Sequence, residues 1–231
     1  MRVIGAMAVG LLTSTVAVGA NVVGYDISSV RKNDPGCGGW CATYGGTVAD
    51  LGGGFVRLSG GGSGTLNDGL VPGSLANNQL LDLSVGPEIT LYLSRPQRVA
   101  SIDLFGYGDG YINNYVPGAI TGLTVTVAGV TQAFATTQFG RSCLFDNYLC
   151  NDRVSLEGSA LAGITTSTVV VSGFRSDFPG YASLAEVSVT PSLVPEPAAA
   201  ALLAVGLALV GTSQRRLPRQ RFVAPSVPTA I

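Results

Sequence analysis

The most constraining feature of this sequence is an alternation of apolar and polar residues that recurs along its middle. In the stretch EITLYLS, Ile89, Leu91 and Leu93 share one face of an extended strand, because successive side chains point to opposite sides. Ile102 and Leu104 continue the alternation in VASIDLF. The middle of the chain has no convincing 3.6-residue period, so the pattern predicts strands and not helices.

A β-hairpin is predicted in GLTVTVAGVTQAFATT. Leu123, Val125 and Val127 share one face, and the turn lies near Ala128-Gly129, where the glycine supplies a positive φ. Further strands are expected in VVGYDIS, GFVRLSG, TVVVSGF and ASLAEVSVT. Turns rich in Gly, Pro and Asn separate these segments. The pattern predicts an all-β fold, a single antiparallel β-sandwich.

The two ends of the chain differ from the middle. Arg2, an apolar stretch and the small residues before position 21 predict a signal peptide that signal peptidase removes. The division that we expect is a signal peptide at 1–20, a β-sandwich at 21–191, a sorting segment at 192–216 and a basic tail at 217–231.

Charge and composition exclude several functions. The predicted sandwich carries more acidic than basic residues and no basic run, which argues against a nucleic-acid partner. The sequence contains no His, so Ser-His-Asp and Cys-His nucleophile systems are excluded. No catalytic residue is predicted, and we expect that the protein is not an enzyme.

The four cysteines form two close pairs, Cys37 with Cys41 and Cys143 with Cys150. Four cysteines allow three disulfide connectivities. In an exported chain we expect the two local pairings, because short loops bring their ends within disulfide reach. The alternative is a zinc site, which would have to be made of cysteines alone.

A cluster of aromatic and polar residues is the predicted ligand site. Sugar recognition uses aromatic platforms together with amide and carboxylate hydrogen bonds. The stretch GYGDGYINNY, together with the only Trp, supplies these groups. The candidate residues are Trp40, Tyr107, Asp109, Tyr111, Asn113 and Tyr115. The alternative is that the aromatic rings only pack these loops down.

An oxygen-rich turn is the candidate metal site. Asn67 and Asp68 precede Gly69 in TLNDGL, and such turns offer the carboxylate, amide and backbone oxygens that Ca²⁺ prefers. In LAEVSV, the alternation places Glu186 on the face that points away from the core. The alternative is that Asn-Asp-Gly forms an ordinary turn.

The order of LNDG, ITLYLSRPQRVASIDLFG, LTVTVAGV and a terminal ASLAEVSV resembles galactose-binding-like jelly-roll domains of the discoidin or carbohydrate-binding-module type. The resemblance implies a jelly-roll sandwich that binds carbohydrate. It also implies a structural Ca²⁺ held by Asp68 and Glu186, with Asn67 nearby.

The C-terminal segment has three parts, which are Pro195-Glu196-Pro197, the apolar run 198–210 and the pair Arg215-Arg216. As a helix, the apolar run would span about 20 Å, less than the ~30 Å hydrocarbon core of a bilayer. The segment is therefore expected to be a short transmembrane helix that anchors weakly. The two arginines would stay on the cytoplasmic side.

This three-part order resembles the PEP-CTERM sorting signal of Gram-negative bacteria. The resemblance implies recognition by an exosortase, cleavage near residues 195–197 and an association with exopolysaccharide and biofilm matrix. The tail 217–231 is basic, and we expect it to be cytoplasmic or disordered.

Taken together, the sequence predicts an exported, exosortase-sorted protein of the cell surface or extracellular matrix. Its sandwich is expected to bind matrix polysaccharide without catalysis, and its contact with the inner membrane is expected to be transient. One alternative is a structural or adhesive matrix protein with no specific glycan site. Another is a secreted hydrolase that uses two carboxylates.

Overall fold

The computed structural model describes residues 21–33, 41–71, 77–107, 119–139, 149–177 and 180–192. This part of the chain forms β-strands and two short 3₁₀ turns. The strands are β1 (Val22–Arg31), β2 (Thr47–Gly52), β3 (Phe55–Gly62), β4 (Gln79–Asp82), β5 (Ile89–Tyr107), β6 (Ile120–Val127), β7 (Val130–Ala135), β8 (Thr137–Gln138), β9 (Leu149–Ser155), β10 (Thr165–Ser176), β11 (Tyr181–Leu184) and β12 (Glu186–Pro191). The 3₁₀ turns are η1 (Thr65–Asn67) and η2 (Leu83–Val85).

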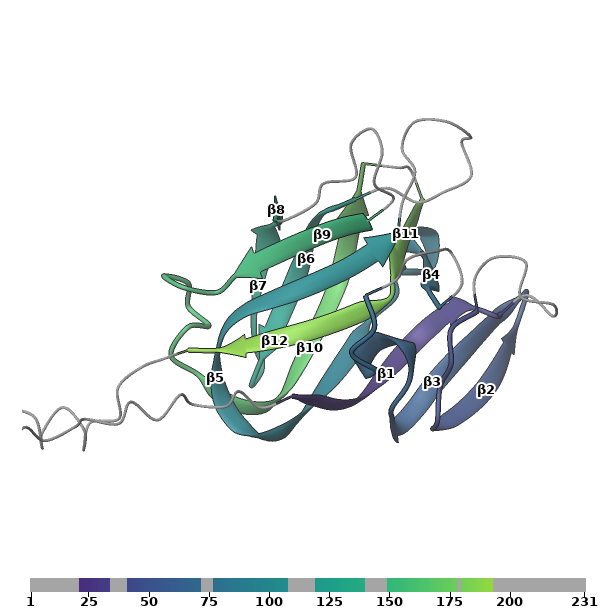
Figure 1. Ribbon diagram of the computed structural model, residues 1–231, viewed down its shortest axis with the longest axis horizontal. Helices are drawn as coiled ribbons and strands as arrows, with labels where there is room; N and C mark the ends of the chain where they lie inside the picture. Colours follow the sequence, from purple (N-terminus) through teal and green to yellow (C-terminus); the bar gives the residue numbers. More distant parts are fainter. Residues whose placement is uncertain are drawn as a thin grey trace, which may run out of the picture. The chain divides into compact units, whose positions relative to one another are not determined.

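The strands are arranged in two layers (Figure 1). One layer has the order β2-β3-β1-β5-β10-β6-β7. In the other layer β5 pairs with β12 and β9, and β9 also pairs with β8. Strands β4 and β11 form a small separate sheet. All ten strand pairings of the described residues are antiparallel, which confirms the predicted antiparallel β-fold.

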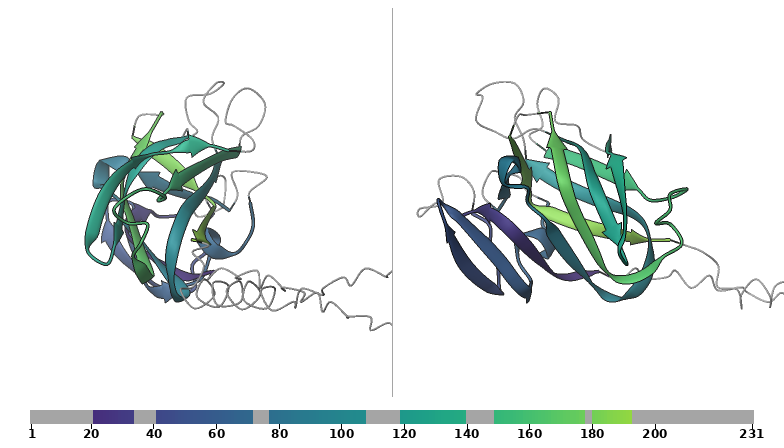
Figure 2. Two further views of the ribbon diagram at one scale, coloured as in Figure 1. Left: turned by 90° about the vertical axis from the view of Figure 1, so that its left-hand side faces the viewer. Right: turned by 180° about the vertical axis from the view of Figure 1, so that it is seen from behind.

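Strand β5 belongs to both layers. In its first half, Ile89 lies opposite Ile27 of β1 on one side and Val171 of β10 on the other. In its second half, Phe105 lies opposite Glu186 of β12. The views in Figure 2 show how this long strand curves from one layer into the other. The two segments that the alternation predicted separately are therefore one bent strand.

The predicted core residues are buried. Ile89, Leu91 and Ile102 have no exposed surface, and they lie between the two layers. The predicted β6–β7 hairpin is also confirmed, because Ala128 and Gly129 occupy its turn with φ angles of 48° and 81°. Alternation thus identified the buried faces of β5 and β6.

Strands β2, β4 and β9 were not predicted, and the single strand expected in ASLAEVSVT is divided into β11 and β12, which belong to different sheets. All six residues of β2 are exposed, so its sequence carries no alternation that could be recognised. Strand β4 is only four residues long and is almost wholly buried. Together with η1 and η2 it lies in the stretch 59–86, which the sequence presented as a long loop.

Strands β1 and β3 approach each other closely at a pair of glycines. A Cβ atom added to Gly24 would lie 2.1 Å from the carbonyl oxygen of Gly61. Only glycine fits at position 24 without moving the neighbouring backbone. The register of both strands shifts near this point, between Tyr25 and Ile27.

The first and last described residues of the sandwich, Asn21 and Ser192, are both hydrogen-bonded to the bend of β5. The backbone N–H of Ser94 donates a 3.0 Å hydrogen bond to the carbonyl oxygen of Asn21. The N–H of Ser192 donates a 2.9 Å hydrogen bond to the carbonyl oxygen of Arg98. The first and last described residues are therefore both fixed to one short stretch of a single strand.

The predicted signal peptide (1–20), most of the sorting segment and the basic tail lie outside the described residues. Within the described ranges, no helix is long and apolar enough to cross a bilayer. The short transmembrane helix was predicted for residues beyond these ranges.

Candidate functional site

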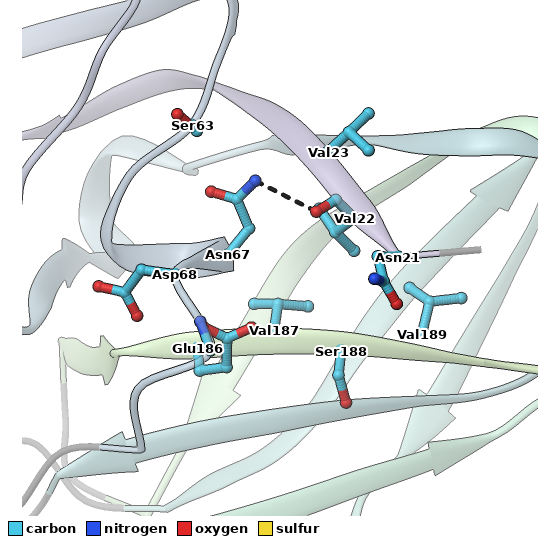
Figure 3. A pocket seen from close by; sticks show the side chains of 11 residues that line it. Asn21, Val22, Val23, Ser63, Asn67, Asp68, Glu186, Val187, Ser188 and Val189 are labelled. Atoms are coloured by element: carbon cyan, nitrogen blue, oxygen red, sulfur yellow. Dashed lines mark hydrogen bonds between the residues drawn. The ribbon is translucent and has the colours of Figure 1, made fainter. Parts of the chain in front are cut away.

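An open hollow of about 600 Å³ lies between the start of β1, the turn at η1 and strand β12. In Figure 3, Asn67 and Asp68 come from the turn, while Glu186 and Ser188 come from β12. The polar groups of the lining are carboxylates, amides and hydroxyls, and valines supply its apolar surface. The lining residues are Asn21, Val22, Val23, Ser63, Asn67, Asp68, Gly69, Glu186, Val187, Ser188 and Val189. The structure thus brings together the three residues that the sequence predicted as metal ligands.

The alternation predicted that Glu186 points away from the core, but the side chain is not exposed to solvent. It is only 8% exposed, because the turn after η1 covers this face of β12. Its Oε2 accepts a 2.9 Å hydrogen bond from the backbone N–H of Gly69. Burial raises the pKa of Glu186 to about 7, and the hydrogen bond from Gly69 only partly opposes this rise. The nearby carboxylate of Asp68 raises this pKa further.

Asp68 is exposed and accepts two hydrogen bonds, one within its own turn and one from a residue further along the chain. Its Oδ1 accepts from the N–H of Leu70 at 2.8 Å, and its Oδ2 accepts from the side-chain amide of Asn77 at 3.2 Å. A carboxylate oxygen can accept more than one bond, so both oxygens retain capacity for a ligand.

Both polar atoms of the Asn67 side chain form hydrogen bonds within the sandwich. Its Oδ1 accepts a 2.8 Å hydrogen bond from the N–H of Gly64, and its Nδ2 donates to the carbonyl oxygen of Val22 at 3.2 Å. The dashed line in Figure 3 marks the second of these bonds. The side chain therefore ties η1 to the edge of β1.

The predicted calcium site fits this geometry in part. Asp68 and Glu186 lie on the same hollow, and a cation would relieve the unfavourable burial of Glu186. Calcium takes six to eight oxygen ligands, so backbone oxygens or water would have to complete its coordination. Among the described residues, no group of three or more acidic, Cys or His side chains could hold a metal ion.

The strand ends near Tyr107 form a second region of interest. Tyr107 lies opposite Leu149 at the end of β5. The N–H of Ile120 donates a 2.9 Å hydrogen bond to Oδ2 of Asp152, which joins the start of β6 to the middle of β9. Burial raises the pKa of Asp152 to about 6. This bond links a strand of each layer near the end of β5.

Most of the predicted tyrosine platform lies outside the described residues. Only the backbone of Tyr107 is described, at the end of β5. The other candidates, Trp40, Asp109, Tyr111, Asn113 and Tyr115, fall in undescribed ranges. The platform remains a prediction.

The disulfides and the sorting signal also remain predictions. Cys41 is half-buried and Cys150 is 3% exposed, but their predicted partners, Cys37 and Cys143, lie outside the described residues. So do Pro195, Glu196, Pro197, Arg215 and Arg216 of the sorting signal.

Sequence reasoning did not select Asn21, Ser63 or Ser188, all of which line the hollow. Ser188 follows Glu186 on the same face of β12, so alternation alone could have placed it beside that residue. For Asn21 and Ser63 the sequence carries no comparable signal, because they meet β12 only through the fold.

Comparison with known proteins gives structural likenesses only. No family model matches the chain, and a search of curated proteins finds no match. Among solved structures, the chain is similar to the family 32 carbohydrate-binding module of NanJ from C. perfringens in complex with galactose. The sequence identity is 17%, the match covers 54% of this chain and 81% of the other, and the TM-score is 0.35.

Two further likenesses are of the same kind. The module of family 32 from AlyQ, in complex with 4,5-unsaturated mannuronic acid, is 14% identical over 55% of this chain and 84% of the other, with a TM-score of 0.34. The C-terminal domain of a chitobiase from Bacteroides fragilis is 15% identical over 66% of this chain and 95% of the other, with a TM-score of 0.36. At these identities and TM-scores, the function of this chain has to rest on its own residues.

Proposed function

We propose that the β-sandwich is a non-catalytic glycan-binding domain of an exported protein. The observation that carries this proposal is the hollow beside β12. Its volume of about 600 Å³ falls within the about 300–1,000 Å³ that is usual for small-molecule sites. Such sites combine apolar surface with a few convergent polar groups, and the hollow has both.

The groups that line the hollow suit the chemistry of a sugar. Sugar hydroxyls donate to carboxylates such as that of Asp68 and exchange hydrogen bonds with hydroxyls such as that of Ser188. The C–H faces of a sugar ring are apolar and can pack against valine side chains. Val23 is 52% exposed and offers such a surface at the edge of the hollow.

A structural Ca²⁺ bound by Asp68 and Glu186 is part of this proposal. The ion would neutralise two carboxylates that lie close together, one of them buried. It would thereby hold the turn at η1 against β12 and fix one wall of the hollow. The chemistry that it supplies is charge neutralisation and coordination, with no catalytic step.

The exported context completes the proposal. The predicted signal peptide and the PEP-CTERM-like segment support a protein that is sorted by an exosortase and meets polysaccharide of the cell surface or matrix. The inner membrane is a transient partner through the short C-terminal helix.

A glycan array with the purified full-length chain tests the proposal. A blank array would overturn it and would favour the structural or adhesive alternative. A positive array should lose its signal in Ser188→Trp, which fills the hollow, and keep it in Thr131→Trp on the exposed edge strand β7. If Tyr107→Ala or Tyr111→Ala abolishes the signal while Ser188→Trp does not, binding occurs at the predicted tyrosine platform and the hollow is the wrong site.

A further inference from the structure

A second, smaller hollow lies on the outer face of the β3-β1-β5 sheet, on the side away from the core. Its volume is about 230 Å³. The three strands contribute side chains of alternating positions, which point outward because their neighbours Ile27 and Leu58 are buried. The polar lining residues are Asp26, Ser28, Arg57, Ser59, Glu88 and Thr90. We call this hollow the sheet-face groove.

The strand register arranges one side of the groove in two rows. Asp26 of β1 lies directly opposite Thr90 of β5. In the next row, the N–H of Ser28 donates to the carbonyl oxygen of Glu88 at 2.9 Å, and the N–H of Glu88 donates to Oγ of Ser28 at 3.0 Å. The floor of the groove is therefore fixed by hydrogen bonds between β1 and the start of β5.

Strand β3 closes the other side. Ile27 lies opposite Leu58, so Arg57 and Ser59 flank the same part of β1. The Nε of Arg57 reaches the carbonyl oxygen of Ser28 at 3.5 Å, which places Arg57 in the row of Ser28. Each row then has three side chains, one from each strand or its start.

Two opposite charges face each other across this groove. Arg57 and Glu88 stand in the same row on either side of Ser28, two strand spacings or about 10 Å apart at the backbone. Among the described residues, ion pairs join Arg31 to Asp82, Lys32 to Asp50 and Arg153 to Asp103. Arg57 and Glu88 are in none of these pairs, and both are exposed, so each remains available to a ligand.

Asp26 gives the groove a rigid wall. Its Oδ2 accepts a 2.7 Å hydrogen bond from the phenol of Tyr92, and its Oδ1 accepts from the N–H of Gly61 at 2.7 Å. The phenol of Tyr44 also donates to Oδ1 at 3.1 Å. A carboxylate held in this way needs little reorganisation on binding, which favours recognition of a ligand of fixed shape.

We propose that the sheet-face groove binds one neutral sugar residue of a polysaccharide. Its volume lies below the about 300 Å³ at which pockets for drug-sized ligands begin, so the occupant is about one small ring. Asp26 and Glu88 disfavour an anion, and Arg57 disfavours a metal cation. Sugar hydroxyls, which both donate and accept, can bond to the guanidinium, the carboxylates and the hydroxyls at once.

This inference rests on the proposed glycan binding and extends it to a second site. The hollow beside β12 and the sheet-face groove share no lining residue. One domain could therefore hold two polysaccharide chains, or two parts of one chain. Binding at two sites raises avidity and allows cross-linking without any further contact.

The test is an NMR titration of the full-length protein with methyl β-galactoside, methyl β-glucoside and methyl α-mannoside. At least one glycoside should shift the amide signals of Ser59 and Thr90. Arg57→Ala and Glu88→Gln should each weaken this binding about tenfold or more, as expected for loss of one charged hydrogen-bonding group. Arg175→Ala, which removes an exposed arginine elsewhere on the sheet, should leave it unchanged. Methyl β-glucuronide, which carries a negative charge, should bind more weakly than the neutral glucoside.

The outcomes separate this inference from the proposed function. Shifts confined to Ser188 and its neighbours would overturn the second site and leave glycan binding at the first. If the shifts at Ser59 and Thr90 persist unchanged in Arg57→Ala and Glu88→Gln, Arg57 and Glu88 do not bind the sugar, and the proposed binding mode is overturned. If no glycoside shifts any signal and the glycan array is blank, both proposals fail.

Discussion

The side chain of Glu186 accepts its hydrogen bond from the backbone of Gly69, which lies 117 residues earlier in the chain. This hydrogen bond holds β12 against the turn that follows η1. It also explains how a carboxyl group can be buried here with only 8% of its surface exposed. The backbone amide of Gly69 supplies one of the hydrogen bonds that water would otherwise make. The protonation state of Glu186 is consequently coupled to the stability of the fold.

The first prediction concerns Glu186→Gln in the presence of EDTA. Burial raises the pKa of Glu186 from 4.5 to about 7, so the folded protein holds this proton more tightly than the unfolded chain. The free energy of unfolding that depends on this group is therefore greatest below about pH 4.5 and falls as the pH rises to about 7. Glutamine does not titrate and can still accept from Gly69.

The Tm of Glu186→Gln, relative to that of the unmodified protein, should accordingly rise by about 2–5 °C between pH 4.5 and pH 7.5. Differential scanning fluorimetry over this range measures the difference. The raised pKa of Asp152 affects both proteins equally and cancels. A difference that stays constant with pH would contradict the prediction.

The second prediction concerns calcium. If Asp68 and Glu186 bind Ca²⁺, saturation at about 100 times the dissociation constant adds about 2.7 kcal/mol to the free energy of unfolding. EDTA should then lower the Tm, and Ca²⁺ should restore it, whereas Asp68→Asn and Glu186→Gln should respond weakly. Asp50→Asn, which changes an exposed carboxylate elsewhere, serves as the control. An unmodified protein whose Tm ignores both EDTA and Ca²⁺ would remove these residues as ligands.

The third prediction concerns the ion pair between Arg31 and Asp82, whose closest atoms are 2.8 Å apart. Burial tends to raise the pKa of Asp82, but hydrogen bonds from Ser84 and Arg31 outweigh it and hold the pKa below its usual value. The stabilisation is therefore present at neutral pH and is lost as the pH falls through the folded-state pKa.

Asp82→Asn should lower the free energy of unfolding by about 1–2 kcal/mol at pH 7, because it removes a charged partner from Arg31. Chemical denaturation should show that this loss shrinks as the pH is lowered below about 4. Asp50→Asn, which breaks an exposed pair with Lys32, should change little at any pH. An equal loss at pH 7 and at pH 3 would show that the charge of Asp82 is not the cause.

The fourth prediction concerns sorting. In cells that contain an exosortase, mass spectrometry of the exported protein should find the chain cut near Pro195-Glu196-Pro197 and the arginines beyond removed. Cells that lack the exosortase should retain the uncut chain. Full-length protein, including the tail after Arg216, recovered from the extracellular matrix would contradict the prediction.

Local alternation was enough to predict the buried faces of β5 and β6, because each face is determined by neighbouring residues of one strand. It could not show that β5 passes through both layers, since strand pairing depends on contacts between distant segments. The same limit applies to Glu186. Its position on the face away from the core was readable, but not the turn that covers it.

The candidate sites, too, could be predicted only in part from the sequence. The sequence placed Asp68 and Glu186 together through a family resemblance, and the fold brings them to one hollow. The sheet-face groove was not anticipated, although alternation puts Asp26 and Arg57 on outward faces. The strand order β3-β1-β5 determines which outward faces become neighbours. This order depends on pairing between distant segments, so local sequence patterns do not reveal it.

Both termini of the sandwich are fixed at the bend of β5, through Asn21 and Ser192, whereas Tyr107 lies at the far end of the second half of that strand. Strand β5 therefore gives the sandwich two distinct ends, one that holds both terminal residues and one that carries Tyr107. The predicted tyrosine platform, which begins at Tyr107, therefore belongs to the end of β5 opposite to both terminal residues.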